Sequence, residues 1–124
     1  GKTLVFSTDC EHYEDRPNKN LIELCKDADV LIYDAQYTED EYYGLNGQFS
    51  RKGWGHSTMQ EGVKVAKAAN VKQLVLFHHD PSHDDNFIKQ IEAESRQLFP
   101  KSIAAYEGLQ IDLSQDACPK SLFD

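Results

Sequence analysis

The sequence predicts an α/β fold in which amphipathic helices cover one sheet. Short apolar runs typical of buried strands alternate along the chain with segments of helical periodicity, the order expected of such a layer. Three of these runs end at Asp9, Asp34 and His78. Strand ends are rigid yet open to solvent, so residues that bind metal or move protons are often found there. The same pattern therefore predicts where the chemistry lies.

The first part of the chain predicts strand, helix and strand. Residues 3–7 form an apolar run that leads into Asp9, whose carboxylate suits metal coordination or proton acceptance. Capping of a turn is the alternative, and spacing alone favours it. Asn18 or Asn20 is expected to cap a short helix, and residues 30–33 form a second strand before Asp34.

Residues 35–53 form a long connection with little periodicity, which is typical of a binding loop or lid. Two interpretations of its aromatic side chains stay open: they line a substrate pocket, or they cover the end of the sheet. These side chains are Tyr37, Tyr42, Tyr43, Phe49 and Trp54.

The next segment predicts a helix followed by a central strand. Ser57 and Gln60 have the spacing of a capping box, and apolar residues at helical intervals follow them. Gly62 inside this helix indicates a close contact with the sheet. Residues 71–77 are apolar and rich in β-branched side chains, as in a strand covered on both faces.

The remaining chain predicts a helix and an edge hairpin. Asp84 or Asp85 is expected to cap a helix over residues 86–99, which Pro100 ends. Residues 102–106 and 109–113 have the pattern of two short strands joined by a turn. The polar tail, residues 114–124, is expected to be poorly ordered.

Composition limits the function classes. The net charge of −8 argues against a broad surface that follows nucleic-acid phosphates, although a local site for a phosphate ester is compatible with it. The 3 cysteines have no CxxC pair, which favours reduced thiols in a cytoplasmic protein and gives no zinc-finger pattern. No apolar run is long enough for a membrane span. Since the chain starts at Gly1, we expect it to be a piece of a longer protein.

Imidazole and carboxylate groups gather at the predicted strand and loop ends, and these are ligands used by hydrolytic zinc, manganese or iron sites. No HExxH motif is present, so surface or core histidines are the alternative. The candidates are Asp9, Asp34, His56, His78, His79 and His83.

Four segments, STDCEHY, LIYDAQYT, GWGHST and LVLFHHDPSHDD, resemble in order and spacing the C-terminal half of a metallo-β-lactamase-fold hydrolase of the ribonuclease Z and phosphodiesterase branch. Each motif is weak alone, and the four together are specific. The resemblance implies half of an αββα sandwich over residues 1–113, with one mixed sheet and helices on one face.

The resemblance also implies residue roles. Asp9 corresponds to the aspartate that bridges two metal ions, and His78 to the last metal-ligand histidine. His56 corresponds to the histidine that assists the departing group, oriented by Asp34. Tyr33 replaces the histidine of the family's His-Glu-Ala-Thr motif, and Asp34 replaces its glutamate.

His79 and His83 have no secure counterpart in the family, and we expect them to contact substrate.

The family's HxHxDH motif is absent from this sequence. The resemblance therefore implies that the complete protein binds two divalent metal ions, with zinc favoured over manganese or iron, and that this chain alone is inactive. The missing N-terminal half would come from the same parent chain or another chain; self-association is an alternative partner for the exposed sheet face. A nucleic-acid partner is left open.

The predicted function is hydrolysis of a phosphodiester or related ester. A non-catalytic binding or scaffold half-domain is the alternative. A receiver-like domain with Asp9 as phosphoacceptor ranks last, because His78 stands where that family has a lysine.

Overall fold

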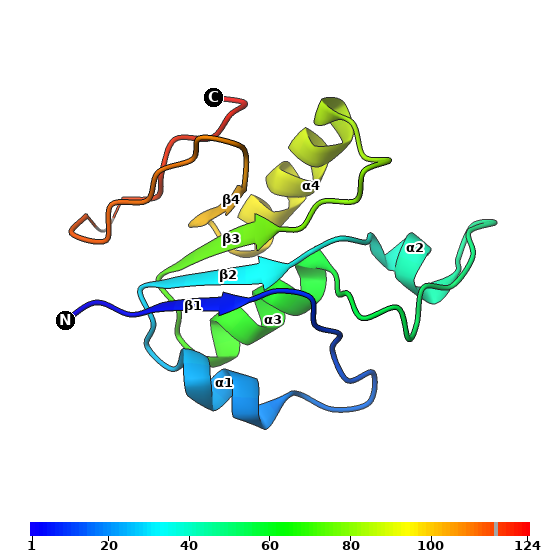
Figure 1. Cartoon of the computed structure of the whole chain (residues 1–124), viewed down its shortest axis with the longest axis horizontal. Coiled ribbons are helices and arrows are strands. Elements are labelled where there is room, and N and C mark those ends of the chain that lie inside the picture. Colours follow the sequence, from blue (N-terminus) through cyan, green and yellow to red (C-terminus); the bar gives the residue numbers. More distant parts are fainter. Residues whose placement is uncertain (116) are drawn as a thin grey trace.

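The computed structural model describes residues 1–115 and 117–124 (Figure 1). The strands are β1 (Leu4–Ser7), β2 (Val30–Asp34), β3 (Gln73–Phe77) and β4 (Ser102–Ala104). The helices are α1 (Lys19–Cys25), α2 (Glu39–Tyr43), α3 (Met59–Ala68) and α4 (Asp85–Leu98). None of these helices is long and apolar enough to cross a membrane.

The four strands form one parallel sheet in the order β1-β2-β3-β4. The α/β class is confirmed, whereas the mixed sheet and the edge hairpin are wrong. β4 pairs parallel to β3, and residues 109–113 form no strand. The side chains of Leu109, Ile111 and Leu113 instead pack on Val75 and its neighbours at the face of the sheet. The alternating apolar residues are therefore buried by packing, and they form no hydrogen-bonded strand.

The helices α1, α3 and α4 pack on one face of the sheet, as expected (Figure 1). The core between them contains Leu31, Leu74 and Leu76, which are completely buried. A Cβ at Gly62 of α3 would lie 2.8 Å from the Cδ1 atom of Tyr33, so the predicted close contact between this helix and the sheet is present. The short helix α2 and the loops around it lie beyond the carboxyl ends of the strands (Figure 1).

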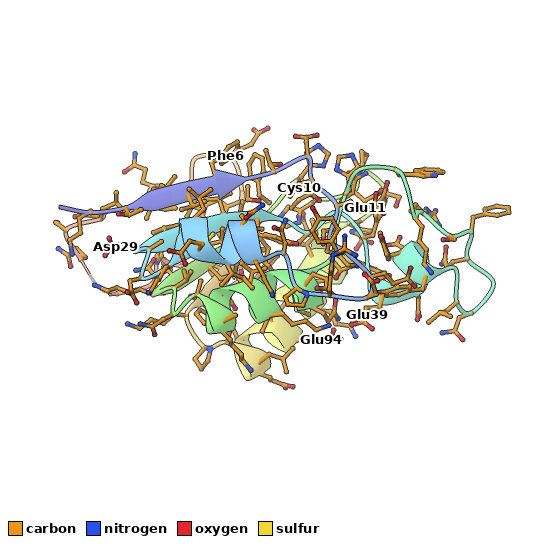
Figure 2. All side chains as sticks on the ribbon, turned by 90° about the horizontal axis from the view of Figure 1, so that it is seen from below. Phe6, Cys10, Glu11, Asp29, Glu39 and Glu94 are labelled. Atoms are coloured by element: carbon orange, nitrogen blue, oxygen red, sulfur yellow. The ribbon has the colours of Figure 1, made fainter. Side chains whose placement is uncertain are left out.

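The opposite face of the sheet is only partly covered. The segment after β4 packs on Val30, Val75 and Ile103. On β1, however, Leu4 is 44% exposed and Phe6 is 57% exposed. Figure 2 shows Phe6 on the side of the sheet away from α3. The face opposite the helices therefore leaves apolar side chains in solvent at its β1 side.

The ends of the helices depart from the sequence prediction at two places. Asn18 caps α1 and Asp84 caps α4, as predicted. The cap of α3 is Thr58 rather than Ser57, whose side chain is turned inward. The capping box predicted there is absent, and one occurs instead at Thr38. The hydroxyl of Thr38 accepts a hydrogen bond from the backbone N–H of the third residue of α2. The sequence pattern predicts a loop, not a helix, at α2.

The outer edge of β4 is capped by side chains of α4. Glu92 accepts a hydrogen bond from the backbone N–H of Ala104 at 2.8 Å, and the Nε atom of Arg96 donates to the carbonyl oxygen of Ser102 at 3.0 Å. Glu92 also accepts from the hydroxyl of Ser121, which is buried. The segment for which little order was expected, residues 114–124, thus contributes a buried contact; its residue 116 lies outside the described residues.

Candidate active site at the carboxyl ends of the strands

The loops that follow β1 and β3 turn sharply so that Asp9 and His78 lie beside each other. Both residues have a positive φ, 51° for Asp9 and 63° for His78. This conformation is unfavourable for a residue with a Cβ, and such strain is concentrated at functional sites. Oδ1 of Asp9 lies 3.5 Å from Nε2 of His78. The sequence prediction that these strand ends converge is consistent with this geometry.

Asp34, at the end of β2, organises the site through hydrogen bonds. Its side chain is completely buried. Its Oδ2 atom accepts from the backbone N–H of Asp9 at 2.9 Å and faces Nδ1 of His56 at 2.8 Å. Its Oδ1 atom accepts from the backbone N–H groups of Gln36 and Ser57, both at 3.2 Å. These contacts satisfy both oxygens of a buried carboxylate and tie the surrounding loops to it.

His56 is held in one orientation by Asp34. Because Asp34 accepts through Oδ2, the proton of the neutral His56 ring sits on Nδ1, and Nε2 is left to act on other groups. The His56 ring stacks on that of His78, with centroids 4.6 Å apart and planes 16° apart. The pair of Asp34 and His56 therefore has the geometry of an oriented general acid or base.

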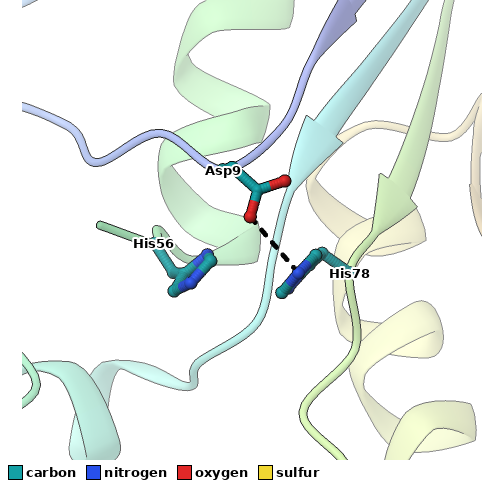
Figure 3. A group of neighbouring side chains, drawn as sticks. All are labelled: Asp9, His56 and His78. Carbon is teal, nitrogen blue, oxygen red and sulfur yellow. Dashed lines mark ion pairs between the residues drawn. The ribbon is translucent and has the colours of Figure 1, made fainter. Parts of the chain in front are cut away.

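Asp9, His56 and His78 point toward one another (Figure 3). Each offers one ligand atom, and these three atoms lie within 4.8 Å of one another. The Nδ1 atom of His78 is buried and has no hydrogen-bond partner among the described residues. Two imidazoles, a carboxylate and a second carboxylate behind one of the imidazoles form a donor set that suits a divalent metal.

His79 and His83 lie outside this group of three. The Nε2 atom of His79 donates to the carbonyl oxygen of Ala105 at 3.0 Å, and burial lowers the pKa of its imidazole. The side chain of His83 is 2% exposed; its Nε2 lies 2.9 Å from Oε1 of Glu41, and its ring stacks on Phe87. In this structure His83 joins α2 to the start of α4, and neither histidine meets the cluster.

A further network of hydrogen bonds, which the sequence did not predict, meets the site at Ser57. Nδ1 of His12 lies 2.8 Å from the hydroxyl of Ser57, which in turn lies 3.1 Å from the hydroxyl of Tyr33. Burial lowers the pKa of the His12 imidazole and raises the pKa of the Tyr33 hydroxyl. The capping pattern masked the role of Ser57, and the only sequence feature that pointed to His12 was its position three residues after Asp9.

The aromatic residues of the long connection divide into two groups. Tyr37 and Tyr42 are buried. Phe49 and Trp54 are 83% and 62% exposed. Burial favours a structural role for Tyr37 and Tyr42, whereas a substrate pocket lined by the exposed rings stays a prediction.

Comparison with known proteins identifies relatives of this chain. A family model described as "Beta-lactamase superfamily domain" matches residues 1–79. A protein named ribonuclease Z from Brevibacillus brevis is 34% identical over 104 residues, which cover 81% of this chain and 29% of that protein. Ribonuclease Z from Archaeoglobus fulgidus is 30% identical over 120 residues, covering 94% of this chain and 34% of that protein.

Two solved structures share the fold. The metallo-beta-lactamase fold protein YhfI from Bacillus subtilis aligns with a TM-score of 0.62 at 19% identity, covering 84% of this chain and 36% of YhfI. The short form of human tRNase Z aligns with a TM-score of 0.59 at 22% identity, covering 91% and 34%. The chain thus spans about a third of the length of the relatives it matches: 29% of the Brevibacillus brevis protein and 34% of the Archaeoglobus fulgidus protein.

Proposed function

Because the chain belongs to the beta-lactamase superfamily and is similar to ribonuclease Z, we propose that it is the C-terminal part of a metal-dependent hydrolase of phosphodiesters. The observation that carries this proposal is the convergence of Asp9, His56 and His78, with Asp34 behind His56. An oriented histidine beside a metal-compatible donor set is an arrangement that supports metal-assisted hydrolysis of an ester.

In the proposed reaction His56 acts as the acid. Asp34 stabilises the protonated imidazole, and Nε2 of His56 gives its proton to the oxygen that leaves the phosphorus atom. Asp9 and His78 would hold metal, zinc in preference to manganese or iron, with a second ion bound in the complete protein. A divalent metal, when bound, supplies Lewis-acid activation of the phosphate and of a water molecule.

The site is incomplete in this chain. The side chain of Asp9 is 63% exposed and that of His78 is 36% exposed, which leaves room for further groups around them. The two proposed ligands, Asp9 and His78, bind a metal weakly compared with the four of a closed site. We therefore propose that an N-terminal half completes the site and that the chain alone is inactive.

The exposed β1 side of the sheet supports the same partner. Leu4 and Phe6 present apolar surface on β1, the strand that leads to Asp9. Size-exclusion chromatography with mass measurement tests this directly: the isolated chain should self-associate, or bind the preceding segment of its parent. A folded monomer that does not bind this segment contradicts the proposal. A cytoplasmic location stays a prediction from the reduced cysteines.

The test of function is metal content together with hydrolysis of bis(p-nitrophenyl) phosphate, for the chain alone and joined to the preceding segment of its parent. Metal and activity should appear only in the joined protein. There, Asp9→Asn and His78→Gln should lose both, whereas His56→Gln should keep the metal and lose about 100- to 10,000-fold in kcat.

Asp15→Asn is the control, because the side chain of Asp15 is 77% exposed and does not belong to the cluster; it should retain activity. A joined protein that binds no metal and hydrolyses no phosphodiester refutes the hydrolase and leaves a binding or scaffold half-domain as the function.

A further inference from the structure

Trp54 is an exposed aromatic side chain on a loop whose backbone is firmly held. The Trp54 side chain is the only tryptophan of the chain and is 62% exposed. The carboxylate of Glu11 accepts hydrogen bonds from the backbone N–H groups on both sides of it, from Gly53 at 2.8 Å and from Gly55 at 3.0 Å. The hydroxyl of Tyr42, which is buried, donates to the same carboxylate. Figure 2 labels Glu11 in the loops beyond the strand ends.

The backbone on each side of Trp54 is built to hold the ring in one place. Gly53 and Gly55 have φ values of 86° and 89°, a conformation that glycine adopts readily, and they turn the chain on each side of the indole. A surface loop that only connects two elements needs neither the turns nor a carboxylate that binds the amides on both sides of the ring. The fixed backbone keeps the indole in one place, and such preorganisation reduces the entropy lost when a ligand binds.

The indole lies close to the proposed acid. Tyr37, which is 4% exposed, contacts both rings: its centroid is 6.4 Å from that of Trp54 and 6.0 Å from that of His56, edge-on in each case. One buried ring thus fixes the distance between the exposed indole and the histidine that would protonate the leaving oxygen. A group attached to that oxygen would reach Trp54.

A positive charge accompanies the ring. The guanidinium carbon of Arg51 lies 5.7 Å from the centroid of the indole. In a chain of net charge −8, a cation beside an exposed aromatic ring is a local site for an anionic ligand with a planar part. Aromatic rings paired with arginine bind nucleobases through their flat faces, largely irrespective of which base is present.

We propose that Trp54 and Arg51 form a stacking subsite for the nucleobase of the substrate, next to the phosphate on which His56 acts. The inference rests on the proposed function and adds to it the residues that would hold the group beside the reacting phosphate. Trp54 stacks on the base, Arg51 attracts the phosphate, and Glu11 positions Trp54 through its two flanking amides.

Tryptophan fluorescence makes the subsite measurable without turnover. Adenosine 5′-monophosphate added to the joined protein should quench this fluorescence to a plateau, whereas ribose 5-phosphate and inorganic phosphate should not, and the quenching should be absent from Trp54→Leu. By calorimetry, Trp54→Leu should weaken AMP binding by about 5- to 100-fold, and Trp54→Phe should restore part of the affinity. Phe49→Leu is the matched control, because Phe49 is exposed on the same loop; it should bind AMP normally.

Two results overturn the subsite. Equal quenching by ribose 5-phosphate would mean that phosphate alone is bound. A Trp54 emission that is blue-shifted in the joined protein, obtained as the difference from Trp54→Leu, and that does not respond to AMP would mean that the N-terminal half covers the ring. His56→Gln separates this proposal from the hydrolase: it should abolish hydrolysis and leave AMP binding intact. If AMP binding depends on Trp54 but the joined protein hydrolyses no phosphodiester, the subsite is supported and only the proposed hydrolysis is refuted.

Discussion

Replacing Asp34 by asparagine tests whether one buried carboxylate holds the site together. In Asp34→Asn the remaining oxygen can still accept from the backbone of Gln36 and Ser57. The new amide group then faces two donors, the backbone N–H of Asp9 and Nδ1 of His56. Each donor left without an acceptor in a buried position costs about 1–2 kcal/mol, so the variant should lose about 2–4 kcal/mol of its free energy of unfolding.

The assay is urea and thermal unfolding followed by circular dichroism. A loss of this size corresponds to a fall in the midpoint temperature of about 8–16 °C for a domain of this length. Asp15→Asn is the control, because the side chain of Asp15 is 77% exposed and should change stability by less than about 0.5 kcal/mol.

A double-mutant cycle with His56→Ala isolates the contact between the two side chains and should give a coupling of about 0.5–3 kcal/mol. Asp34→Asn with the stability of Asp15→Asn, or a coupling near zero, would refute the role assigned to Asp34.

Three further perturbations test other parts of the structure. Gly62→Ala should destabilise the protein by about 1–2 kcal/mol although alanine favours helices, because the new Cβ would lie 2.8 Å from Tyr33; chemical denaturation that shows a more stable variant contradicts the close contact. Ile103→Ala should cost about 2–5 kcal/mol because Ile103 is completely buried, whereas Phe6→Ala should cost less than about 1 kcal/mol in the isolated chain; equal losses would mean that Phe6 is covered. Burial lowers the pKa of His12 below its ordinary 6.5, so the unfolded chain takes up the proton first as pH falls, and stability present above pH 6.5 is lost below it. His12→Gln should flatten this dependence between pH 7.5 and 5.5 in unfolding titrations, and an unchanged slope would exclude His12 as its source.

Much of the site could be predicted from the sequence because strand ends are readable from apolar runs. Asp9, Asp34 and His78 each follow such a run, and parallel strands bring their carboxyl ends to one edge. The orientation of His56 could not be derived in this way, since it depends on a hydrogen bond between residues of different loops. The resemblance to a known family supplied that pairing.

The failed predictions have a common physical origin in tertiary packing. Residues 109–113 alternate like a strand, yet their apolar side chains pack on the sheet face instead of extending its edge. Ser57 has the spacing of a helix cap, yet its hydroxyl is used by His12 and Tyr33, and the neighbouring Thr58 caps the helix. Local patterns do not specify which long-range partner a polar group or an apolar face will find.

The contrast between the two edges of the sheet bears on how copies of this chain could aggregate. Glu92 binds the backbone N–H of Ala104 and Arg96 binds the carbonyl of Ser102 on the outer edge of β4, so a strand from another molecule would meet groups that are already bonded there. Within the described residues, β1 is the other edge and pairs only with β2. Fibre growth by strand addition needs two adhesive edges on every molecule, whereas one edge suffices for a pair. If exposed β1 edges meet, the association therefore stops at two chains.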